Sequence, residues 1–577
     1  MTPDPLTLAV VKGSLEEVVE EMDRIVERAA FSPVISQARD RASGVYKGTT
    51  GEVVVQGESG LPIFIGAMQF STQAVLEQIG RDNIAPDDLF IVNDPYSGGT
   101  HLMDVKLVKP VFLGDELFVF LSNTGHWIDV GGTVPGGFPV SATEIFQEGL
   151  RIPPVKLYER GVLNRWVLSL IMSNIRVPQE SHGDLMAMVN ALEVGEVRLR
   201  EVIRRFGRET IDACVEILEG RSEAQMRENI RRIRPGRYTF EDFMDNDGIR
   251  DEPLCIALDL DVGDGRMRFD LSRSSPPCRG PMNLARATTV SALLVAVKHC
   301  FPDVPVNSGC FRPLSFVIPE TTFLAATPPR PVSGFAEVTQ RVMDVVFGAL
   351  NQALPGELFA APMATANNLT LAGHREDGSR FVAYLFHGGG HGGNAETDGL
   401  VHASPTLSIS RIQPVEILER RYPLRYVRYA VRENSGGAGR QRGGCGTEYE
   451  LEVLVDDVRI SLCGDRARFG PFGVGGGASG ARNEVEFVVA GQRHEPPLGA
   501  KQDGVILNRG DRIVIRSPGG GGLGDPMTRA VGAVVDDLRL GFIDAGAART
   551  VYGVALTSDG AVDQAVTARL RAKAAHD

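Results

Sequence analysis

The chain has 577 residues, of which 43% are hydrophobic and 23% charged, and its formal net charge is −13. This length predicts roughly two to four domains with a large core. The negative charge, without a dense block of Lys and Arg, argues against nucleic acid or an anionic membrane as the main partner. No stretch of about 18 apolar residues is present, so no segment is expected to span a membrane.

Seven cysteines are spread along the sequence without a CxxC pair. This usage is typical of reduced thiols buried as small hydrophobic residues, and it does not favour a zinc site built on cysteine. Cys300 and Cys310 have no neighbouring residues that support a nucleophile, so core positions are favoured for them. The N-terminus has no basic stretch followed by an apolar one, so no signal peptide is expected. A cytoplasmic protein is therefore predicted.

The N-terminal part is predicted to combine helices, short strands and one hairpin. Apolar spacing predicts an amphipathic helix over 7–30, and residues 182–232 carry a long helical pattern. A strand (51–57), a helix ending at Gly80 (67–80) and a strand entering the loop after residue 92 are expected between them. Two β-rich runs, "DVKLVKPVFL" and "ELFVFLSN", flank Gly114-Asp115 and predict a hairpin.

The later parts of the chain change in composition. Alternating patterns predict strands over 236–275, and two helices are expected near 284–300 and 336–353. From residue 381, strand-like segments alternate with glycine-rich connectors. Two of these connectors, 473–480 and 517–526, are interpreted as turns that need positive φ. A helical tail is expected over 527–546 and 560–575.

These patterns predict a mixed α+β fold in three domains. The first, 1–235, would be the catalytic metal-site region with long helices. The second, 236–380, would be a mixed α/β domain. The third, 381–577, would be β-rich with the helical tail.

The predicted hairpin places several metal-binding side chain types at its open end. A two-residue turn at Gly114-Asp115 pairs residues whose numbers sum to about 229, so Asp104 would face Gly125, next to His126. His101 would fall near Asp129. Histidine with carboxylate is a ligand set for zinc, manganese or ferrous iron. Loops at the end of a rigid hairpin are also where functional residues concentrate.

Other candidate motifs are weaker. His387 and His391 in "HGGGHGG" are four residues apart, but five glycines argue against a helix that would align them, so a flexible turn or a loop near the substrate is favoured over a metal site. The sequence contains neither GxxxxGK[ST] nor a GxSxG elbow, and no nucleotide site is predicted.

Several long stretches resemble the hydantoinase B family. They include "NDPYSGGTHLMDVKLVKPVF", "SNTGHWIDVGGTVPGGFPVSATEIFQEGLRIPPVKLYERGVLN" and "NIRVPQESHGDLMAMVNAL". Near the C-terminus, "PVEILERRYPLRYVRYAVRENSGGAGRQRGGCG" and "SPGGGGLGDP" share the resemblance, which covers about residues 7–545. This family includes B subunits of N-methylhydantoinases, the C-terminal half of 5-oxoprolinases and alpha subunits of acetone carboxylases.

The resemblance implies a division of labour between two subunits. A hydantoinase A-type ATPase partner would bind ATP and phosphorylate the substrate carbonyl, whereas this chain would hold a divalent metal (zinc, manganese or iron) and open the ring of a hydantoin, lactam or 5-oxoproline. A hetero-oligomer such as a dimer of heterodimers would follow. The missing nucleotide motif fits this arrangement.

The resemblance also implies a ligand set. Asp40 of "SQARDRAS", His101, Asp104 and His126 are expected to hold the metal. Glu148 is suggested for proton transfer or substrate positioning, with a hydrogen bond that braces its loop as the alternative role.

Asp129 is suggested as a proton acceptor or as a group that orients a ligand, with a solvated loop position as the alternative. For the whole chain, two other functions stay open at this point: the alpha subunit of a carboxylase of the acetone carboxylase type, and a non-catalytic scaffold for the ATPase.

Overall fold

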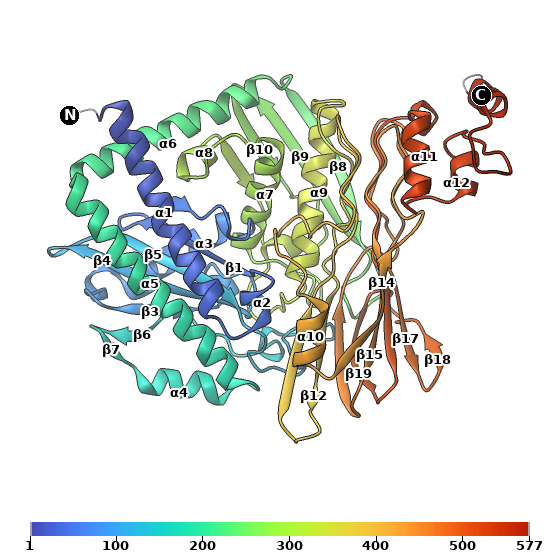
Figure 1. Ribbon diagram of the computed structural model, residues 1–577. Helices are drawn as coiled ribbons and strands as arrows, with labels where there is room; N and C mark the ends of the chain where they lie inside the picture. Colours follow the sequence, from blue (N-terminus) through green and yellow to red (C-terminus); the bar gives the residue numbers. More distant parts are fainter. Residues whose placement is uncertain (1–2, 575–577) are drawn as a thin grey trace.

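The fold has two parts that lie side by side in the computed structural model, which describes residues 3–574 except for the side chains of Ile65 and Ala574. We call residues 3–353 the N-terminal lobe and residues 368–517, which form two packed sheets, the β lobe (Figure 1). The helices near the C-terminus lie on the far side of the β lobe. The predicted mixed α+β class is confirmed.

The helices are distributed over both lobes and the C-terminal end. Their bounds are α1 Pro5–Ala29, α2 Pro33–Ser36, α3 Phe64–Ile79, α4 Arg165–Ser173, α5 Pro178–Phe206, α6 Arg208–Arg231, α7 Arg286–Cys300, α8 Ser308–Phe311, α9 Phe335–Ala353, α10 Val415–Arg421, α11 Val531–Arg539, α12 Ala545–Thr550 and α13 Gln564–Ala574.

The strands form four sheets. Their bounds are β1 Arg41–Lys47, β2 Val53–Gln56, β3 Leu89–Val92, β4 Asp104–Leu113, β5 Glu116–His126, β6 Val155–Glu159, β7 Val162–Leu163, β8 Gly236–Met244, β9 Leu254–Gly263, β10 Arg266–Asp270, β11 Leu314–Val317, β12 Asn368–His374, β13 Arg380–Leu385, β14 Leu424–Val431, β15 Thr447–Val453, β16 Val458–Cys463, β17 Glu484–Val489, β18 Gln492–His494, β19 Lys501–Leu507 and β20 Arg512–Arg516.

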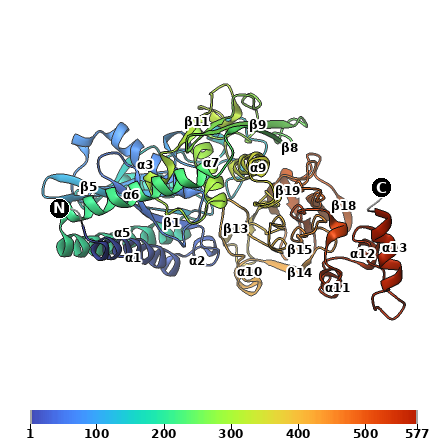
Figure 2. The ribbon, with the colours of Figure 1, turned by 90° about the horizontal axis from the view of Figure 1, so that it is seen from above.

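Helix α1 shows how the N-terminal lobe is assembled from sequence signals. Asp4 caps it by accepting hydrogen bonds from the amides of Leu6 and Thr7, and Pro5 occupies the first turn, where its missing N–H costs nothing. The buried face of α1 packs on α5 and β1, and Figure 2 shows α1 and α5 together along one side of the lobe. The two helices thereby cover the first sheet.

The first sheet carries the predicted hairpin at its centre. Its strand order is β2-β1-β5-β4-β3-β6-β7, with antiparallel pairing throughout. Strands β3 and β4 are buried over nearly their whole length. Because both faces of the central strands are covered, these strands are rigid supports for residues at their ends.

A second sheet, β11-β10-β9-β8, packs on helix α9. Nearly all of α9 is buried, and it also packs on α7, which in turn contacts α3. The apolar core of the N-terminal lobe is continuous from α1 to α9.

The β lobe is a pair of packed sheets. One has the order β13-β12-β16-β19 and the other β14-β15-β20-β17-β18. Their inner faces share a separate apolar core that includes Leu371, Ile460 and Ile513. Alternation of buried and half-buried residues over the first four residues of β15 is typical of strands with one face on a core.

Most predicted elements of regular structure are present. The helix predicted over 7–30 is α1, and the pattern over 182–232 is divided between α5 and α6, which meet at Gly207. The predicted tail contains α11, α12 and α13. Strand β1 and helix α4 were not predicted. Strand β1 follows a short helix in a polar segment, and no element was predicted over 166–173.

The division into domains at 235/236 and 380/381 stays a prediction. Strand β12 belongs by sequence to the predicted middle domain, yet it pairs with β16 of the predicted third domain. Pairing across residue 380 therefore joins the two segments in one sheet.

The glycine-rich connectors pack against one another as a layer of backbone, which we call the glycine layer (387–393, 436–446, 473–480 and 518–524). The amide of Gly390 donates to Pro518 O at 3.0 Å, that of Gly520 to Gly444 O at 2.9 Å, and that of Gly437 to Gly520 O at 2.8 Å. A Cβ on Gly390 would lie 1.9 Å from Gly444 O. These positions require glycine because neighbouring backbones approach too closely for any side chain.

The expectation that the connectors 473–480 and 517–526 are turns with positive φ is wrong for most of their glycines. Gly475, Gly476 and Gly524 do have positive φ, whereas Gly390, Gly444 and their packed neighbours do not. Sequence alone does not distinguish a glycine needed for its φ from one needed for close packing.

A cluster of buried charges joins the two lobes. It consists of Asp242, Arg341, Asp344, Asp465, Arg466 and Lys501. Arg341 on α9 reaches Asp465 of the β lobe at 3.1 Å, and Lys501 reaches the same carboxylate at 2.7 Å. Arg466 of the β lobe also crosses the boundary, because it pairs with Asp344 on α9. Each buried charge thus has an opposite charge beside it, several of them across the lobe boundary.

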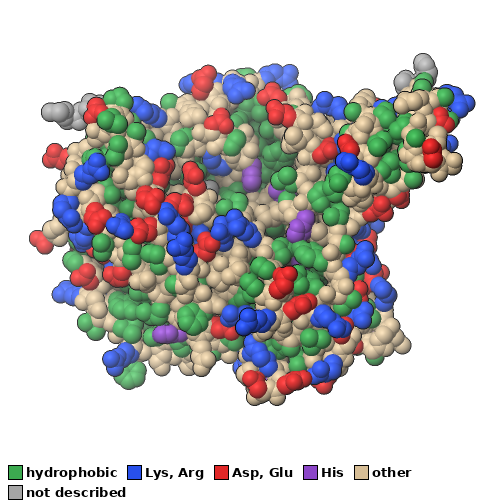
Figure 3. Space-filling view, in the orientation of Figure 1, with side chains coloured by type: hydrophobic (Ala, Val, Ile, Leu, Met, Phe, Trp, Pro, Cys, Tyr) green, Lys and Arg blue, Asp and Glu red, His purple; other side chains and the backbone are tan. Residues whose placement is uncertain are grey.

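The surface shown in Figure 3 has acidic and basic side chains interspersed, and histidines lie beside a hollow where the two lobes meet. Within residues 3–574, no helix is long and apolar enough to cross a membrane.

We expect Gly390→Ala to lower the stability of the protein because the new methyl group meets the Gly444 carbonyl. Forced overpacking of this kind costs about 1–3 kcal/mol. The apparent melting temperature should therefore fall. Gly220→Ala is the matched control, since a Cβ at this helical position meets nothing within 4 Å. An unchanged melting temperature for Gly390→Ala would contradict the packing argument.

Candidate metal centre

Three strand ends of the first sheet meet at the site. Asp104, the first residue of β4, lies directly opposite His126, the last residue of β5. Strand β1 pairs with the other edge of β5, and the carbonyl of Asp40, just before β1, accepts a hydrogen bond from the His126 amide at 3.1 Å. The strand pairing therefore brings Asp40, Asp104 and His126 to one edge.

The register of the hairpin differs by one residue from the predicted one. The turn at Gly114-Asp115 is confirmed, but Asp104 pairs with His126 rather than with Gly125. A β-bulge leaves Phe118 of β5 without a partner on β4, and this extra residue shifts all later pairs. The shift brings the two candidate ligands into direct opposition.

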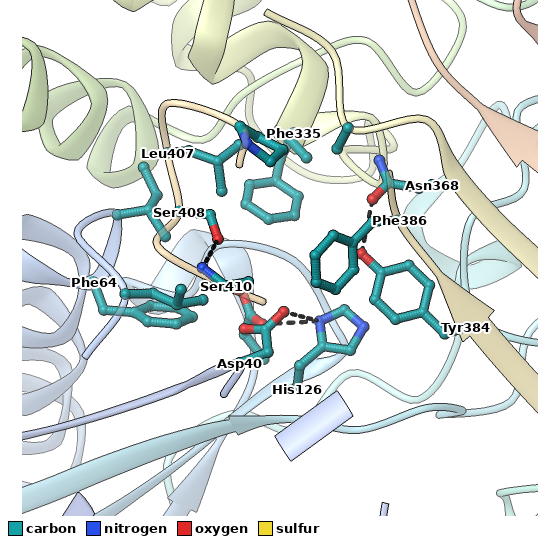
Figure 4. Close-up of a pocket in the computed structure, with 16 residues that line it drawn as sticks. Asp40, Phe64, His126, Phe335, Asn368, Tyr384, Phe386, Leu407, Ser408 and Ser410 are labelled. Atoms are coloured by element: carbon teal, nitrogen blue, oxygen red, sulfur yellow. Dashed lines mark hydrogen bonds and ion pairs between the residues drawn. The ribbon is translucent and has the colours of Figure 1, made fainter. Parts of the chain in front are cut away.

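The side chains of His101, Asp104 and His126 converge. His101 Nε2 lies 3.2 Å from Asp104 Oδ1, and His126 Nδ1 lies 3.4 Å from the same oxygen. One ligand atom from each of the three residues falls within 4.8 Å of the others. Asp40 lies slightly farther out, with Oδ2 3.8 Å from His126 Nδ1, as Figure 4 shows.

This arrangement fits a divalent cation. All three side chains are buried, and neither ring nitrogen of His101 makes a well-directed hydrogen bond to any described residue. Buried imidazole nitrogens without partners are costly, and a metal ion would satisfy them. Two imidazoles with one or two carboxylates are a donor set suited to zinc, manganese or ferrous iron.

The electrostatics of the two carboxylates differ. Burial raises the pKa of Asp40 to about 7, with His126 opposing the shift and Asp104 adding to it. Burial acts on Asp104 in the same direction, but the two histidines beside it hold its pKa well below the usual range. Asp104 is therefore the permanent anion of the site.

The two histidines also differ. Burial lowers the pKa of His101 despite the neighbouring Asp104, which favours the neutral ring that binds metals. For His126 burial acts in the same direction, but the carboxylates of Asp104 and Asp40 outweigh it and raise the pKa. Protons and a metal ion would thus compete at His126.

Two further residues, Thr100 and Lys106, contact Asp104. The hydroxyl of Thr100 donates to Asp104 Oδ2, and Lys106 Nζ lies 3.3 Å from the Asp104 carbonyl oxygen. Burial lowers the pKa of Lys106 to about 8, and Asp104 partly offsets this. The hydroxyl fixes the rotation of the carboxylate and leaves Oδ1 directed at the histidines.

A small cavity of about 30 Å³ opens beside these side chains. Asp40, Asp104 and His126 form part of its wall, and apolar residues from both lobes form most of the rest (Figure 4). Tyr384 of β13 stacks on the His126 ring, with ring centroids 4.6 Å apart, and Phe335 of α9 stacks on His101 at 4.2 Å. The aromatic packing holds both imidazoles in place and keeps water away.

Asp129 lies in the loop after β5, and its carboxylate is fully engaged there. One oxygen accepts from the amides of Gly131 and Arg176, and the other accepts from Gly136 and from the Arg176 guanidinium at 2.9 Å. These contacts brace the loop. A role for Asp129 in proton transfer or in orienting a ligand stays a prediction.

Glu148 is buried and also braces a loop. Its Oε1 accepts hydrogen bonds from the amides of Val332 and Ser333, both at 2.7 Å, while Oε2 has no hydrogen-bond partner among the described residues. Burial raises the pKa of Glu148 to about 8 against the opposing effect of these bonds. The suggested role in proton transfer or substrate positioning stays a prediction.

The two histidines of "HGGGHGG" lie apart from the metal ligands, in the glycine layer. His387 stacks on Tyr449 with ring centroids 3.5 Å apart. His391 Nε2 lies 2.8 Å from the carbonyl oxygen of Ser404. The segment is a packed part of the fold rather than a flexible turn.

Several residues of the cavity wall were not predicted from the sequence. Phe335, Asn368, Tyr384 and Phe386 come from α9, β12 and the end of β13. Their sequence segments carry only the pattern of buried helix and strand. Proximity to the histidines arises from packing between the lobes, which no local signal reports.

Residues 4–526 match the family described as hydantoinase B/oxoprolinase, and the chain belongs to this family. It is 32% identical to the beta subunit of the caprolactamase of Pseudomonas jessenii over 99% of both chains. It is 30% identical to the B subunit of a putative D-/L-hydantoinase of a Pseudomonas species over 98% of each.

Solved structures agree with this assignment. The crystal structure of ATP-dependent caprolactamase from Pseudomonas jessenii matches 99% of this chain and 100% of its own chain, with 29% identity and a TM-score of 0.92. A nucleotide-free acetone carboxylase structure matches all of this chain and 83% of its own, with 21% identity and a TM-score of 0.90. The second likeness shows a shared fold only.

We expect Asp104→Asn to weaken metal binding more than Asp40→Asn. Asp104 touches both histidines and has the lower pKa, whereas Asp40 lies farther from His126. Isothermal titration of the metal-stripped protein with zinc or manganese measures the metal affinity of both variants. We expect the affinity to fall about 10- to 100-fold for Asp40→Asn and by more for Asp104→Asn. Unchanged affinity in Asp40→Asn would remove Asp40 from the ligand set.

Glu148 should make stability depend on pH. Its pKa is raised in the folded state, so the folded protein binds the proton more tightly than the unfolded chain. Stability from this group is complete below about pH 4.5 and is lost as the pH rises toward 8. Compared with wild type, Glu148→Gln should gain a few degrees of melting temperature between pH 5 and pH 8.5. If the difference in melting temperature between wild type and Glu148→Gln does not change with pH, the Glu148 carboxyl is not held protonated by burial.

Proposed function

We propose that this chain is the B-type subunit of an ATP-dependent cyclic amidase. It opens the ring of a cyclic amide after an A-type ATPase partner has phosphorylated the amide carbonyl. The observation that carries the proposal is the convergence of His101, Asp104 and His126 beside a mostly apolar cavity, in a chain of the hydantoinase B/oxoprolinase family.

Ring opening needs activation because amide resonance makes the carbonyl carbon a poor electrophile. Phosphorylation of the carbonyl oxygen makes the carbon more electrophilic. Water then adds to this carbon, the ring C–N bond breaks as a proton passes to the nitrogen, and a second water releases phosphate from the resulting acyl phosphate. A divalent metal bound at this site would supply Lewis acidity and lower the pKa of water. The chain's own residues provide two neutral or cationic imidazoles, a fixed carboxylate at Asp104 and a wall that excludes bulk water.

Asp40 is suited to hold or release a proton at the site. Its carboxyl lies on the cavity wall and its pKa of about 7 is close to neutral pH. Groups with a pKa near the working pH are the most effective general acids and bases. Asp40 therefore acts either as the fourth ligand, as the sequence resemblance implies, or as the proton acceptor for the attacking water.

The partner is proposed from the relatives. One relative is named as a beta subunit and another as a B subunit, and the solved caprolactamase is described as ATP-dependent. We therefore propose that an A-type ATPase partner holds the ATP and that the two chains form a hetero-oligomer. All seven cysteines are free thiols, which supports a reducing compartment such as the cytoplasm.

His126→Ala tests the proposed function in the complex with the ATPase partner. The variant should lose bound metal and ring-opening activity, because the removed imidazole is central to the triad, while co-purification with the partner survives. Metal content, ATP consumption and product are measured together, without bicarbonate. His182→Ala is the control, since this histidine lies exposed on α5.

Two outcomes would contradict the proposal. Full ring opening by a metal-free His126→Ala complex would show that the triad is not the reaction site. ATP consumption by the wild-type complex that requires bicarbonate and yields a carboxylated product would identify a carboxylase instead.

A further inference from the structure

The wall of the cavity beside the candidate metal centre is more apolar than polar. Its apolar members come from five separate segments of the two lobes and are Leu61, Ile63, Phe64, Phe335, Ala336, Ala366, Phe386, Pro405 and Leu407. Apart from the candidate ligands, its polar side chains are Asn368, Tyr384, Ser408 and Ser410. Figure 4 shows these groups around the space in front of Asp40 and His126.

Apart from the candidate ligand His126, the charged side chains on this wall are carboxylates. Asp40 and Asp104 line the cavity, and none of the described residues that line it is Lys or Arg. The ammonium of Lys106 lies 5.6 Å from the centre of the Phe64 ring and is directed at the Asp104 backbone. A divalent ion bound here would have its two charges offset by the two carboxylates. A further carboxylate on a substrate would therefore enter without a partner, which is costly in a buried site.

One polar group on the wall is fixed in direction. Tyr384 donates its hydroxyl hydrogen to Asn368 Oδ1 at 2.8 Å, and Asn368 in turn donates to Glu337 Oε1 at 3.1 Å. Glu337 is completely buried and also accepts from the Ala366 amide. This chain of hydrogen bonds holds the Tyr384 oxygen on the wall with lone pairs still available. An amide N–H is the natural donor for them.

We propose that the cavity selects an uncharged lactam with a hydrocarbon ring, and that Tyr384 is the residue that recognises its N–H. The ring carbons lie against Phe335, Phe386 and Leu407. A ring that carries a carboxylate, as 5-oxoproline does, is rejected because the wall offers it no cation. This inference rests on the proposed function and narrows its substrate class.

The cavity has a volume of about 30 Å³, which is more than the roughly 10–15 Å³ that one ordered water needs. Part of the wall comes from the segment 404–410, which has neither helix nor strand. It is tied to the N-terminal lobe through the hydrogen bond from the Ile63 amide to Leu407 O, at 3.2 Å.

The first test compares two substrates that differ by one carboxylate. The complex with the ATPase partner is assayed on 2-pyrrolidinone and on 5-oxoproline, with caprolactam as an unrelated uncharged lactam. We expect kcat/KM at least tenfold higher for 2-pyrrolidinone than for 5-oxoproline. The opposite preference, with good turnover, would overturn the inference and leave the proposed function standing. No turnover of any cyclic amide would overturn both.

A second test adds a positive charge to the cavity wall. Ser408→Lys places an ammonium on the cavity wall and should raise the ratio of 5-oxoproline to 2-pyrrolidinone turnover at least tenfold. Ile409→Lys is the matched control, because this neighbour is exposed and does not line the cavity. An equal change in both variants would contradict the inference. If Ser408→Lys does not assemble with the partner, the wild-type substrate ratio decides alone.

A third test addresses Tyr384. Tyr384→Phe keeps the ring that stacks on His126 and removes only the hydroxyl. It should lower kcat/KM about tenfold for 2-pyrrolidinone but leave the value for 1-methyl-2-pyrrolidinone, which has no N–H, unchanged, with metal content preserved. An equal loss on both substrates would show that the hydroxyl has only a structural role.

Discussion

The site depends on the antiparallel pairing of three neighbouring strands. Strand β5 pairs with β1 on one side and β4 on the other, and the ends of all three lie at the same edge of the sheet. A change of one residue in the register would turn His126 to the opposite face. The bulge at Phe118 therefore decides whether two candidate ligands meet at all.

The surroundings of the ligands then decide their chemistry. Burial alone would neutralise every carboxyl group and every imidazole in the site, but the close approach of His101 and His126 keeps Asp104 ionised. One aromatic ring from α9 of the N-terminal lobe and one from β13 of the β lobe stack on the two histidines. The N-terminal lobe thus supplies the candidate ligands, and both lobes supply the residues that surround them.

Part of this arrangement could be predicted from the sequence. The turn at Gly114-Asp115, the hairpin and the convergence of His101, Asp104 and His126 follow from local signals, because strand pairing across a two-residue turn is a short-range effect. The addition of β1, and with it Asp40, comes from pairing between distant segments; here only the family resemblance pointed to Asp40. Tyr384 and Asn368 were not predicted, since their positions at the cavity depend on how the lobes pack.

The buried charges between the lobes bear on how such a protein can be divided. Asp465, Arg466 and Lys501 have part of their counter-charges on α9 and β8, so each lobe alone lacks partners for some of its buried charges. A fragment that ends between the lobes would expose these charged side chains without their partners. The two lobes are therefore not suited to separate exchange between relatives. A chimera should exchange α9 together with the strands that it faces.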